Sequence, residues 1–134
     1  MENFYTAKTE MEIREEQALL LALNRDKLLR FNLLFDVPRL YHCKSVTPSL
    51  NIGEYEDRYF SLFSNEGPTF LHIIDSISYL QNKDDWCPVG KGIIPYKGLI
   101  DKFNKCTDPI IIFEFESVDY LTQSRDFFIR NGIV

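Results

Sequence analysis

The sequence lacks the features that most readily identify nucleic-acid-binding, membrane-spanning and secreted proteins. Its 134 residues carry a formal net charge of -5 and contain no run of five basic residues, which argues against a general affinity for phosphate backbones. The longest apolar stretches, such as Pro109 to Phe113, are far shorter than the roughly 20 residues that a membrane helix needs. The opening residues show no basic segment followed by an apolar one. We therefore expect a cytoplasmic protein with no membrane partner and no nucleic-acid partner.

The sequence also lacks the cysteine patterns of disulfide frameworks and thiolate zinc sites. The three cysteines, Cys43, Cys87 and Cys106, are odd in number and widely spaced, and they include no C-x-x-C pair. Reduced structural thiols are the simplest interpretation. Internal repeats, low-complexity segments and Gly/Ser linkers are absent too, so we expect residues 1–134 to form a single domain. Its core can draw on eleven Phe and seven Tyr.

What is present is an alternation of short apolar runs and helical patterns, which predicts an α/β fold. The apolar runs are interpreted as buried strands at about residues 32–37, 69–74 and 110–115. Helices are expected at about residues 13–24, 52–64, 97–105 and 118–131; the first follows a capping box from Thr9 to Glu12, and the last is stopped by Gly132. Strands that are apolar throughout and separated by helices indicate a parallel sheet covered on both faces.

Each predicted strand carries one metal-competent side chain near its C-terminal end: Asp36, His72 and Glu114. Taken singly, each has an ordinary explanation, such as a loop cap or a hydrogen-bonded core histidine. However, an ionised carboxylate in an apolar strand costs several kcal/mol unless it is compensated, and ligands of α/β folds bind at this end of the strands. Carboxylate oxygens and imidazole suit Mn²⁺, Mg²⁺, Co²⁺ or Zn²⁺. Asp36, His72 and Glu114 are separated in sequence by about one βα repeat each, and Glu2 lies about one repeat before Asp36.

These residues and their neighbours resemble the C-terminal half of the xylose isomerase-like (β/α)₈ barrel family, which includes sugar isomerases and epimerases and the apurinic endonucleases. The loop of residues 75–96 is long enough to suggest a functional role, and within it residues 84–94 resemble the "PGxGxI" segment that lies over the family's active site. Four further segments resemble the ends of the family's fifth to eighth strands in order, namely Glu2-Asn3, residues 34–39, residues 71–75 and residues 111–114.

The resemblance implies a parallel-stranded partial (β/α)₈ TIM barrel of about four βα units, spanning residues 1–134. It implies a metal-dependent sugar or sugar-phosphate isomerase or epimerase, whose divalent metal is bound by Glu2, Asp36, His72 and Glu114. Glu2 and Glu114 are then the acid and base that move a proton next to a carbonyl. Candidate substrate-binding residues are Asp75, Asp84 and Arg39. The two aspartates could also orient His72, and capping of the loop explains them about as well as either functional role.

Departures from the family pattern keep other functions open. Arg39 stands where family members often carry His, and Trp86 stands where the endonuclease branch has a zinc-binding histidine. Both weaken the alternative of an apurinic endonuclease-like hydrolase. A complete barrel typically takes about 250 residues, so the chain corresponds to half of one. Open strand edges predict a homo-oligomer or pairing with a separate N-terminal half, and they make a non-catalytic half-barrel interaction module the remaining alternative.

Overall fold

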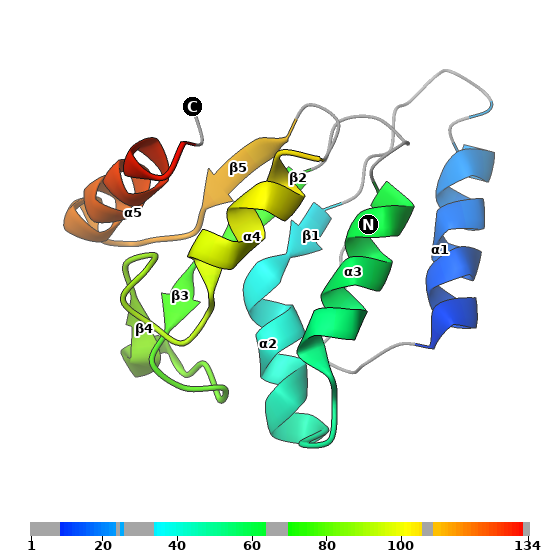
Figure 1. Cartoon of the computed structure of the whole chain (residues 1–134), viewed down its shortest axis with the longest axis horizontal. Coiled ribbons are helices and arrows are strands. Elements are labelled where there is room, and N and C mark those ends of the chain that lie inside the picture. Colours follow the sequence, from blue (N-terminus) through cyan, green and yellow to red (C-terminus); the bar gives the residue numbers. More distant parts are fainter. Residues whose placement is uncertain (1–8, 24, 26–33, 64–69, 106–108, 133–134) are drawn as a thin grey trace.

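A three-stranded parallel sheet lies at the centre of the molecule (Figure 1). The structure is a computed structural model that describes residues 9–23, 25, 34–63, 70–105 and 109–132. The strands stand in the order β1-β2-β5. Their bounds are Leu34–Asp36 for β1, Phe70–Ile73 for β2 and Ile110–Phe113 for β5. The predicted α/β fold with parallel strands is therefore confirmed, while the first strand end, with Glu2, lies outside the described residues.

Most of the helices match the apolar periodicity of the sequence. They are α1 (Glu10–Leu23), α2 (Val37–Val46), α3 (Ile52–Phe63), α4 (Tyr96–Phe103) and α5 (Val118–Arg130). The predicted capping box of α1 is confirmed, because the N–H of Thr9 donates to Glu12 Oε2 at 2.7 Å and the N–H of Glu12 donates to Thr9 Oγ1 at 3.3 Å. Among the described residues, no helix is long and apolar enough to cross a bilayer.

Helix α2 is the one that the periodicity did not predict. Pro38 looks like the end of a strand, but it lies in the first turn of α2, where a missing N–H leaves no hydrogen bond unmade. Asp36 is the N-cap, and its Oδ1 accepts the N–H of Arg39 at 3.2 Å. The chain therefore passes from strand to helix with no connecting loop, which holds the first turn of α2 against the end of β1.

One face of the sheet forms the hydrophobic core. Phe35, Leu71 and Ile73 project from this face and are 1%, 0% and 0% exposed. Ile111 and Phe113 of β5 pack against the same core. The helices contribute most of the rest: Val37, Leu40 and Tyr41 from α2, Tyr55 and Phe60 from α3, Tyr96, Leu99, Ile100 and Phe103 from α4, and Phe128 from α5. Val89 and Ile94 join the core from the loop between β4 and α4. We call this the packed face of the sheet.

The alternate residues of the same strands form a more exposed face, which we call the open face. Leu34, Phe70 and Ile110 form one row across it, and Asp36, His72 and Ile112 form the next. Ile110 and Ile112 are 43% and 38% exposed. Within the described part of the chain, the expectation of a sheet covered on both faces is therefore met on the packed face alone.

The segment between β2 and α4 contains more structure than its sequence suggested. β3 (Asp75–Ser76) pairs antiparallel with β4 (Trp86–Cys87), and a short 3₁₀ helix, η1 (Lys83–Asp85), lies between them. Because β3 follows β2 after a single residue, this small hairpin begins at the C-terminal edge of the parallel sheet (Figure 1). It brings Trp86 close to the ends of the strands.

Candidate functional site

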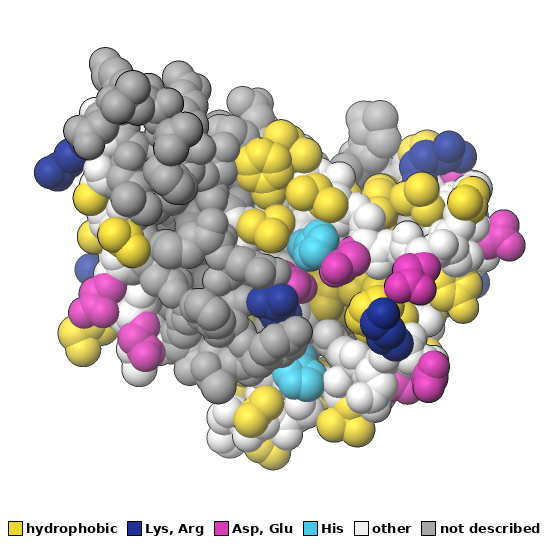
Figure 2. All heavy atoms as spheres, turned by 180° about the vertical axis from the view of Figure 1, so that it is seen from behind, with side chains coloured by type: hydrophobic (Ala, Val, Ile, Leu, Met, Phe, Trp, Pro, Cys, Tyr) yellow, Lys and Arg dark blue, Asp and Glu magenta, His cyan; other side chains and the backbone are white. Residues whose placement is uncertain are grey.

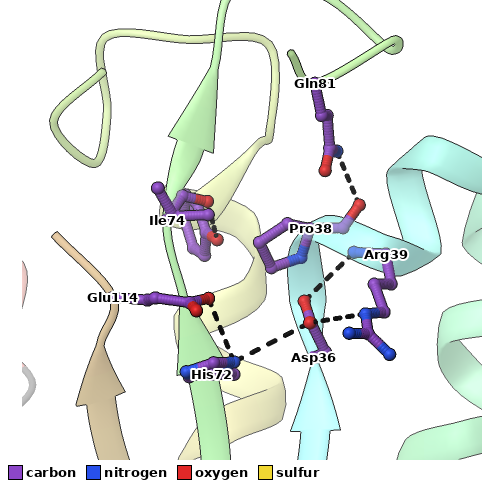
Figure 3. Close-up of polar contacts among 8 residues, drawn as sticks. Asp36, Pro38, Arg39, His72, Ile74, Gln81 and Glu114 are labelled. Carbon is purple, nitrogen blue, oxygen red and sulfur yellow. Dashed lines mark hydrogen bonds and ion pairs between the residues drawn. The ribbon is translucent and has the colours of Figure 1, made fainter. Parts of the chain in front are cut away.

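Asp36, His72 and Glu114 converge at the C-terminal edge of the sheet (Figure 3). Asp36 and His72 lie opposite each other in the register of β1 and β2. Glu114 directly follows β5, and its N–H donates to the carbonyl of Ile73 at 3.2 Å. His72 Nδ1 lies 3.4 Å from Glu114 Oε2 and 3.7 Å from Asp36 Oδ2. The three side chains that the sequence singled out on separate strands therefore form one cluster.

The members of this cluster differ in their access to solvent. The side chain of Asp36 is 7% exposed and that of His72 is 19% exposed, whereas that of Glu114 is 55% exposed. A buried carboxylate needs compensation, and Asp36 obtains it from Arg39, whose Nε lies 3.0 Å from Asp36 Oδ2. This is the same oxygen that faces His72. The guanidinium of Arg39 thus compensates the negative charge of Asp36 and fixes the carboxylate oxygen that lies next to His72.

The cluster opens into a pocket of ≈ 390 Å³. Figure 2 shows both histidines of the chain on one face of the molecule, with acidic and basic side chains between them. The wall of the pocket combines charged, amide and apolar side chains, which is the usual composition of a small-molecule site. Its lining residues are Asp36, Pro38, Arg39, His42, Ile74, Leu80, Gln81, Trp86 and Glu114. Asp36, Arg39 and Glu114, all predicted site residues, share this pocket.

Three pocket residues whose side chains can form hydrogen bonds escaped the sequence interpretation as site residues: His42, Gln81 and Trp86. Gln81 Nε2 donates to the carbonyl of Pro38 at 2.6 Å, and Trp86 Nε1 donates to the carbonyl of Gln81 at 3.2 Å. His42 Nδ1 lies 3.1 Å from the carbonyl oxygen of Leu80. Gln81 has φ 53°, a left-handed conformation that is uncommon outside glycine. These contacts join α2 to the β3–β4 hairpin and close one side of the pocket.

Asp75 has a different position from the other predicted site residues. It is 0% exposed and does not line the pocket. Its carboxylate accepts four backbone N–H groups, those of Ser76 at 2.8 Å, Gly90 at 2.9 Å, Gly92 at 3.0 Å and Ile94 at 3.2 Å. A Cβ on Gly92 would collide with the Asp75 carboxylate, so the loop requires glycine there. These contacts support the interpretation that Asp75 organises the loop.

The ionisation of Asp75 reflects two opposing effects. Burial raises the pKa of its carboxyl above the ordinary value, and the four backbone N–H donors act in the opposite direction. The fixed donors also define where the carboxylate must lie. The segment from Gly90 to Ile94 is therefore anchored to the end of β2 through one side chain.

The remaining predicted residues lie elsewhere. Asp84 is exposed in η1 and borders a second cavity of ≈ 270 Å³ rather than the pocket beside Asp36. Glu2 falls outside the described residues, so its role as ligand and acid or base stays a prediction. Cys106 also lies outside them, while Cys43 and Cys87 are buried, and burial raises the pKa of Cys87 to about 11.

The cluster offers carboxylate and imidazole donors of the types that bind divalent metals. Two ligands of one small divalent ion are separated by roughly 3 to 3.5 Å, given metal–ligand distances of about 2.0–2.2 Å. The separations from His72 Nδ1, 3.4 Å to Glu114 and 3.7 Å to Asp36, are close to this range. However, in the described part of the chain, no group of three or more His, Cys, Asp or Glu is arranged as a preformed metal site. The donors fit a metal in type and approximate spacing, provided that the side chains contract slightly and Arg39 shares or releases Asp36.

Comparisons with models of protein families, with curated proteins and with solved structures found no match to this chain. The resemblance to the xylose isomerase-like barrels therefore stays a prediction. The side chains at the C-terminal edge of the sheet therefore provide the evidence from which a function can be inferred.

Proposed function

We propose that this chain is the C-terminal half of a (β/α)₈-type barrel that acts as a metal-dependent isomerase or epimerase of a sugar or sugar phosphate. The observation that carries the proposal is the convergence of Asp36, His72 and Glu114 from three adjacent parallel strands beside one pocket. This is the edge of a parallel sheet at which α/β enzymes bind their ligands. Neither of the two described cysteines joins the cluster, and the carboxylate and imidazole donors suit hard or borderline divalent cations.

The proposed ligands are Asp36, His72, Glu114 and Glu2. When bound, the cation would polarise the carbonyl and neighbouring hydroxyl oxygens of the substrate and so stabilise negative charge developing there. Arg39 beside Asp36 already supplies one fixed positive charge to this region. Its guanidinium is suited to bind a phosphate or hydroxyl group of the substrate.

Proton transfer is assigned to the glutamates. The carboxylate of Glu114 is 55% exposed and lines the pocket, so it can approach a carbon of a bound substrate. In the proposed reaction, one glutamate takes the proton from the carbon next to the carbonyl, and a proton returns to the substrate at the neighbouring carbon or on the opposite face. No atom is gained or lost overall. Glu2 is the second member of this pair by resemblance.

The test is metal-dependent thermal stability with Mn²⁺, Mg²⁺, Co²⁺ and Zn²⁺. At a free metal concentration 100 times Kd, the melting temperature of the wild-type chain should rise by about 5–10 °C. His72→Ala should abolish the rise. The chain contains two histidines, and His42 lines the pocket outside the cluster, so His42→Ala is the matched control and should keep the rise.

If His42→Ala and His72→Ala respond equally to every cation, metal binding does not involve the cluster and the proposal fails. If the wild-type chain folds and no cation changes its melting temperature, the proposal fails as well. Where a cation does stabilise the wild-type chain, conversion of aldose and ketose sugars and of their phosphates in its presence tests the reaction itself.

A second candidate, the non-catalytic half-barrel module, is favoured by a different observation. Ile110 and Ile112 on the open face are 43% and 38% exposed in a strand at the sheet's edge. Apolar residues exposed beside a strand edge are suited to pairing with a further strand-bearing partner. Sedimentation equilibrium of the wild-type chain and of Ile112→Lys tests this candidate. Self-association that the substitution removes, without any metal response, would favour the module over the enzyme.

A further inference from the structure

Three adjoining cavities extend from the cluster along the β3–β4 hairpin. The pocket of ≈ 390 Å³ shares Trp86 and Glu114 with a cavity of ≈ 460 Å³. The cavity of ≈ 460 Å³ in turn shares Lys83, Trp86, Phe115 and Glu116 with the cavity of ≈ 270 Å³ that Asp84 borders. Because Trp86 borders all three, we call them together the Trp86 groove. The site around Asp36 is therefore one end of a longer depression.

The end of the Trp86 groove away from Asp36 has its own chemical character. Phe115 and Tyr120 meet there edge to face, with ring centroids 6.1 Å apart. Lys83 Nζ lies 3.3 Å from Glu116 Oε1, so this ammonium is neutralised by a neighbouring carboxylate. Ser117 adds a hydroxyl to the wall. Aromatic rings beside paired charges and hydroxyl groups suit a neutral, hydroxyl-rich ring better than they suit an anion.

Trp86 is held in place between the two ends. Its Nε1 donates to the carbonyl of Gln81, and its backbone pairs with Ser76 in the β3–β4 ladder. Lys83 Nζ lies 5.9 Å from the centroid of its ring. A ring fixed in this way can contact a ligand without losing much side-chain freedom, which favours binding.

We propose that the substrate carries a second ring, as in a reducing disaccharide or another glycoside, and that this ring binds between Trp86, Phe115 and Tyr120. The reducing sugar would lie in the pocket beside Asp36 and Glu114. The apolar C–H faces of a sugar ring pack against aromatic rings, while its hydroxyl groups can reach Lys83, Glu116 and Ser117. This inference rests on the proposed function for the position of the reducing sugar, and its far subsite is a binding site in its own right.

Trp86 provides the measurement, because it is the one tryptophan of the chain and borders both ends of the groove. Its fluorescence is titrated with cellobiose, lactose and maltose and, separately, with glucose and galactose. At least one disaccharide should bind about three- to tenfold more tightly than either monosaccharide, the range expected for an added aromatic contact.

Substitutions at the far end should remove this preference. Tyr120→Ala, on the partly exposed side of α5, and Phe115→Ala should each bring the ratio of disaccharide to monosaccharide affinity close to one. Tyr79→Ala is the matched control, because Tyr79 is 41% exposed and lines none of the three cavities. Circular dichroism melts verify that each variant is folded.

The inference is overturned if none of the disaccharides binds more tightly than the monosaccharides, or if the preference survives in both Tyr120→Ala and Phe115→Ala. Quenching of Trp86 by Mn²⁺ is recorded in the same samples and tests the metal site separately. Quenching that requires His72, without a disaccharide preference, would refute the far subsite and leave the proposed function standing. A disaccharide preference that requires Tyr120, without quenching by Mn²⁺, would refute the metal site of the proposed function and leave the far subsite standing.

Discussion

The two faces of the parallel sheet are built from alternate residues of the same strands, yet they differ in burial and in polarity. On the packed face, Phe35, Leu71 and Ile73 are at most 1% exposed. On the open face, β2 carries the polar residue His72, and the neighbouring strand β5 carries Ile112, which is 38% exposed. Because successive side chains of a strand point to opposite faces, the same extended backbone can place core residues on one face and polar residues on the other.

The open face has a cost that the packed face does not have, because a shielded carboxylate must be compensated. Asp36 is compensated by the first turn of α2, through the N–H and the guanidinium of Arg39. Its neighbour His72 lies between two carboxylates. Local contacts of α2 thus maintain a polar cluster at the edge of an apolar sheet. Substitutions on the packed face and on the open face can therefore show how independently the two faces contribute to stability and to metal binding.

The largest effect is expected on the packed face. Leu71→Ala removes a fully buried side chain from the central strand, and it should lower the free energy of unfolding by about 2–5 kcal/mol. Ile112→Ala on the open face should cost less than about 1 kcal/mol, because its side chain is already partly in water. Urea unfolding of both variants measures the contrast. Equal losses would mean that the open face is buried in the native protein.

The second largest effect is expected for Asp75→Asn, which should lower the free energy of unfolding by about 2–3 kcal/mol. The amide group would place N–H donors against backbone N–H groups, which leaves buried donors unsatisfied. Asp84→Asn is the matched control in the same loop and should change stability by no more than about 0.5 kcal/mol, because Asp84 is exposed. Urea unfolding at neutral pH is the measurement. Similar values for the two variants would refute the role of Asp75 as the loop's anchor.

A smaller effect concerns the dependence of this anchor on pH. Since burial raises the pKa of Asp75 in the folded state, the folded state binds the proton more tightly than the unfolded state does. The side chain's contribution to stability is then greatest below about pH 4 and declines as pH rises through the folded-state pKa. The stability of wild type relative to Asp75→Asn should decrease over that range. A relative stability that increases with pH would mean that the four N–H donors outweigh burial.

The smallest effect on stability is expected at Glu114. Its side chain is 55% exposed, so Glu114→Gln should change the free energy of unfolding by no more than about 0.5 kcal/mol. The same substitution should greatly weaken stabilisation by divalent metal, because an amide is a poorer ligand than a carboxylate. Thermal unfolding with and without Mn²⁺ gives both values. A large loss of stability without metal would show that Glu114 supports the fold itself.

The regular part of the fold could be predicted from the sequence because its apolar patterns are strong and local. The strands ending at Asp36 and near Ile73 and Phe113 follow from continuous apolar runs, and α3 and α5 follow from helical periodicity. Helix α2 could not be predicted in the same way, since Pro38 is compatible with both a strand end and a first helical turn.

The site was predictable where it depends on strand ends and obscure where it depends on tertiary contacts. The pattern of the strands was enough to select Asp36, His72 and Glu114. The wall formed by His42 and Gln81 depends on how α2 meets the β3–β4 hairpin, through hydrogen bonds between residues distant in sequence. His42 lies three residues after Arg39, so a correct prediction of α2 would have placed both on one side of that helix.

We propose that the polar cluster of the open face binds a divalent cation, whereas the packed face stabilises the fold. Isothermal titration of Mn²⁺ into the wild-type chain, His42→Ala and His72→Ala tests it most directly. We expect one strongly bound ion per chain in the wild type and in His42→Ala, and no comparable binding in folded His72→Ala. Equal binding by both histidine variants, or no binding by the folded wild-type chain, would contradict it.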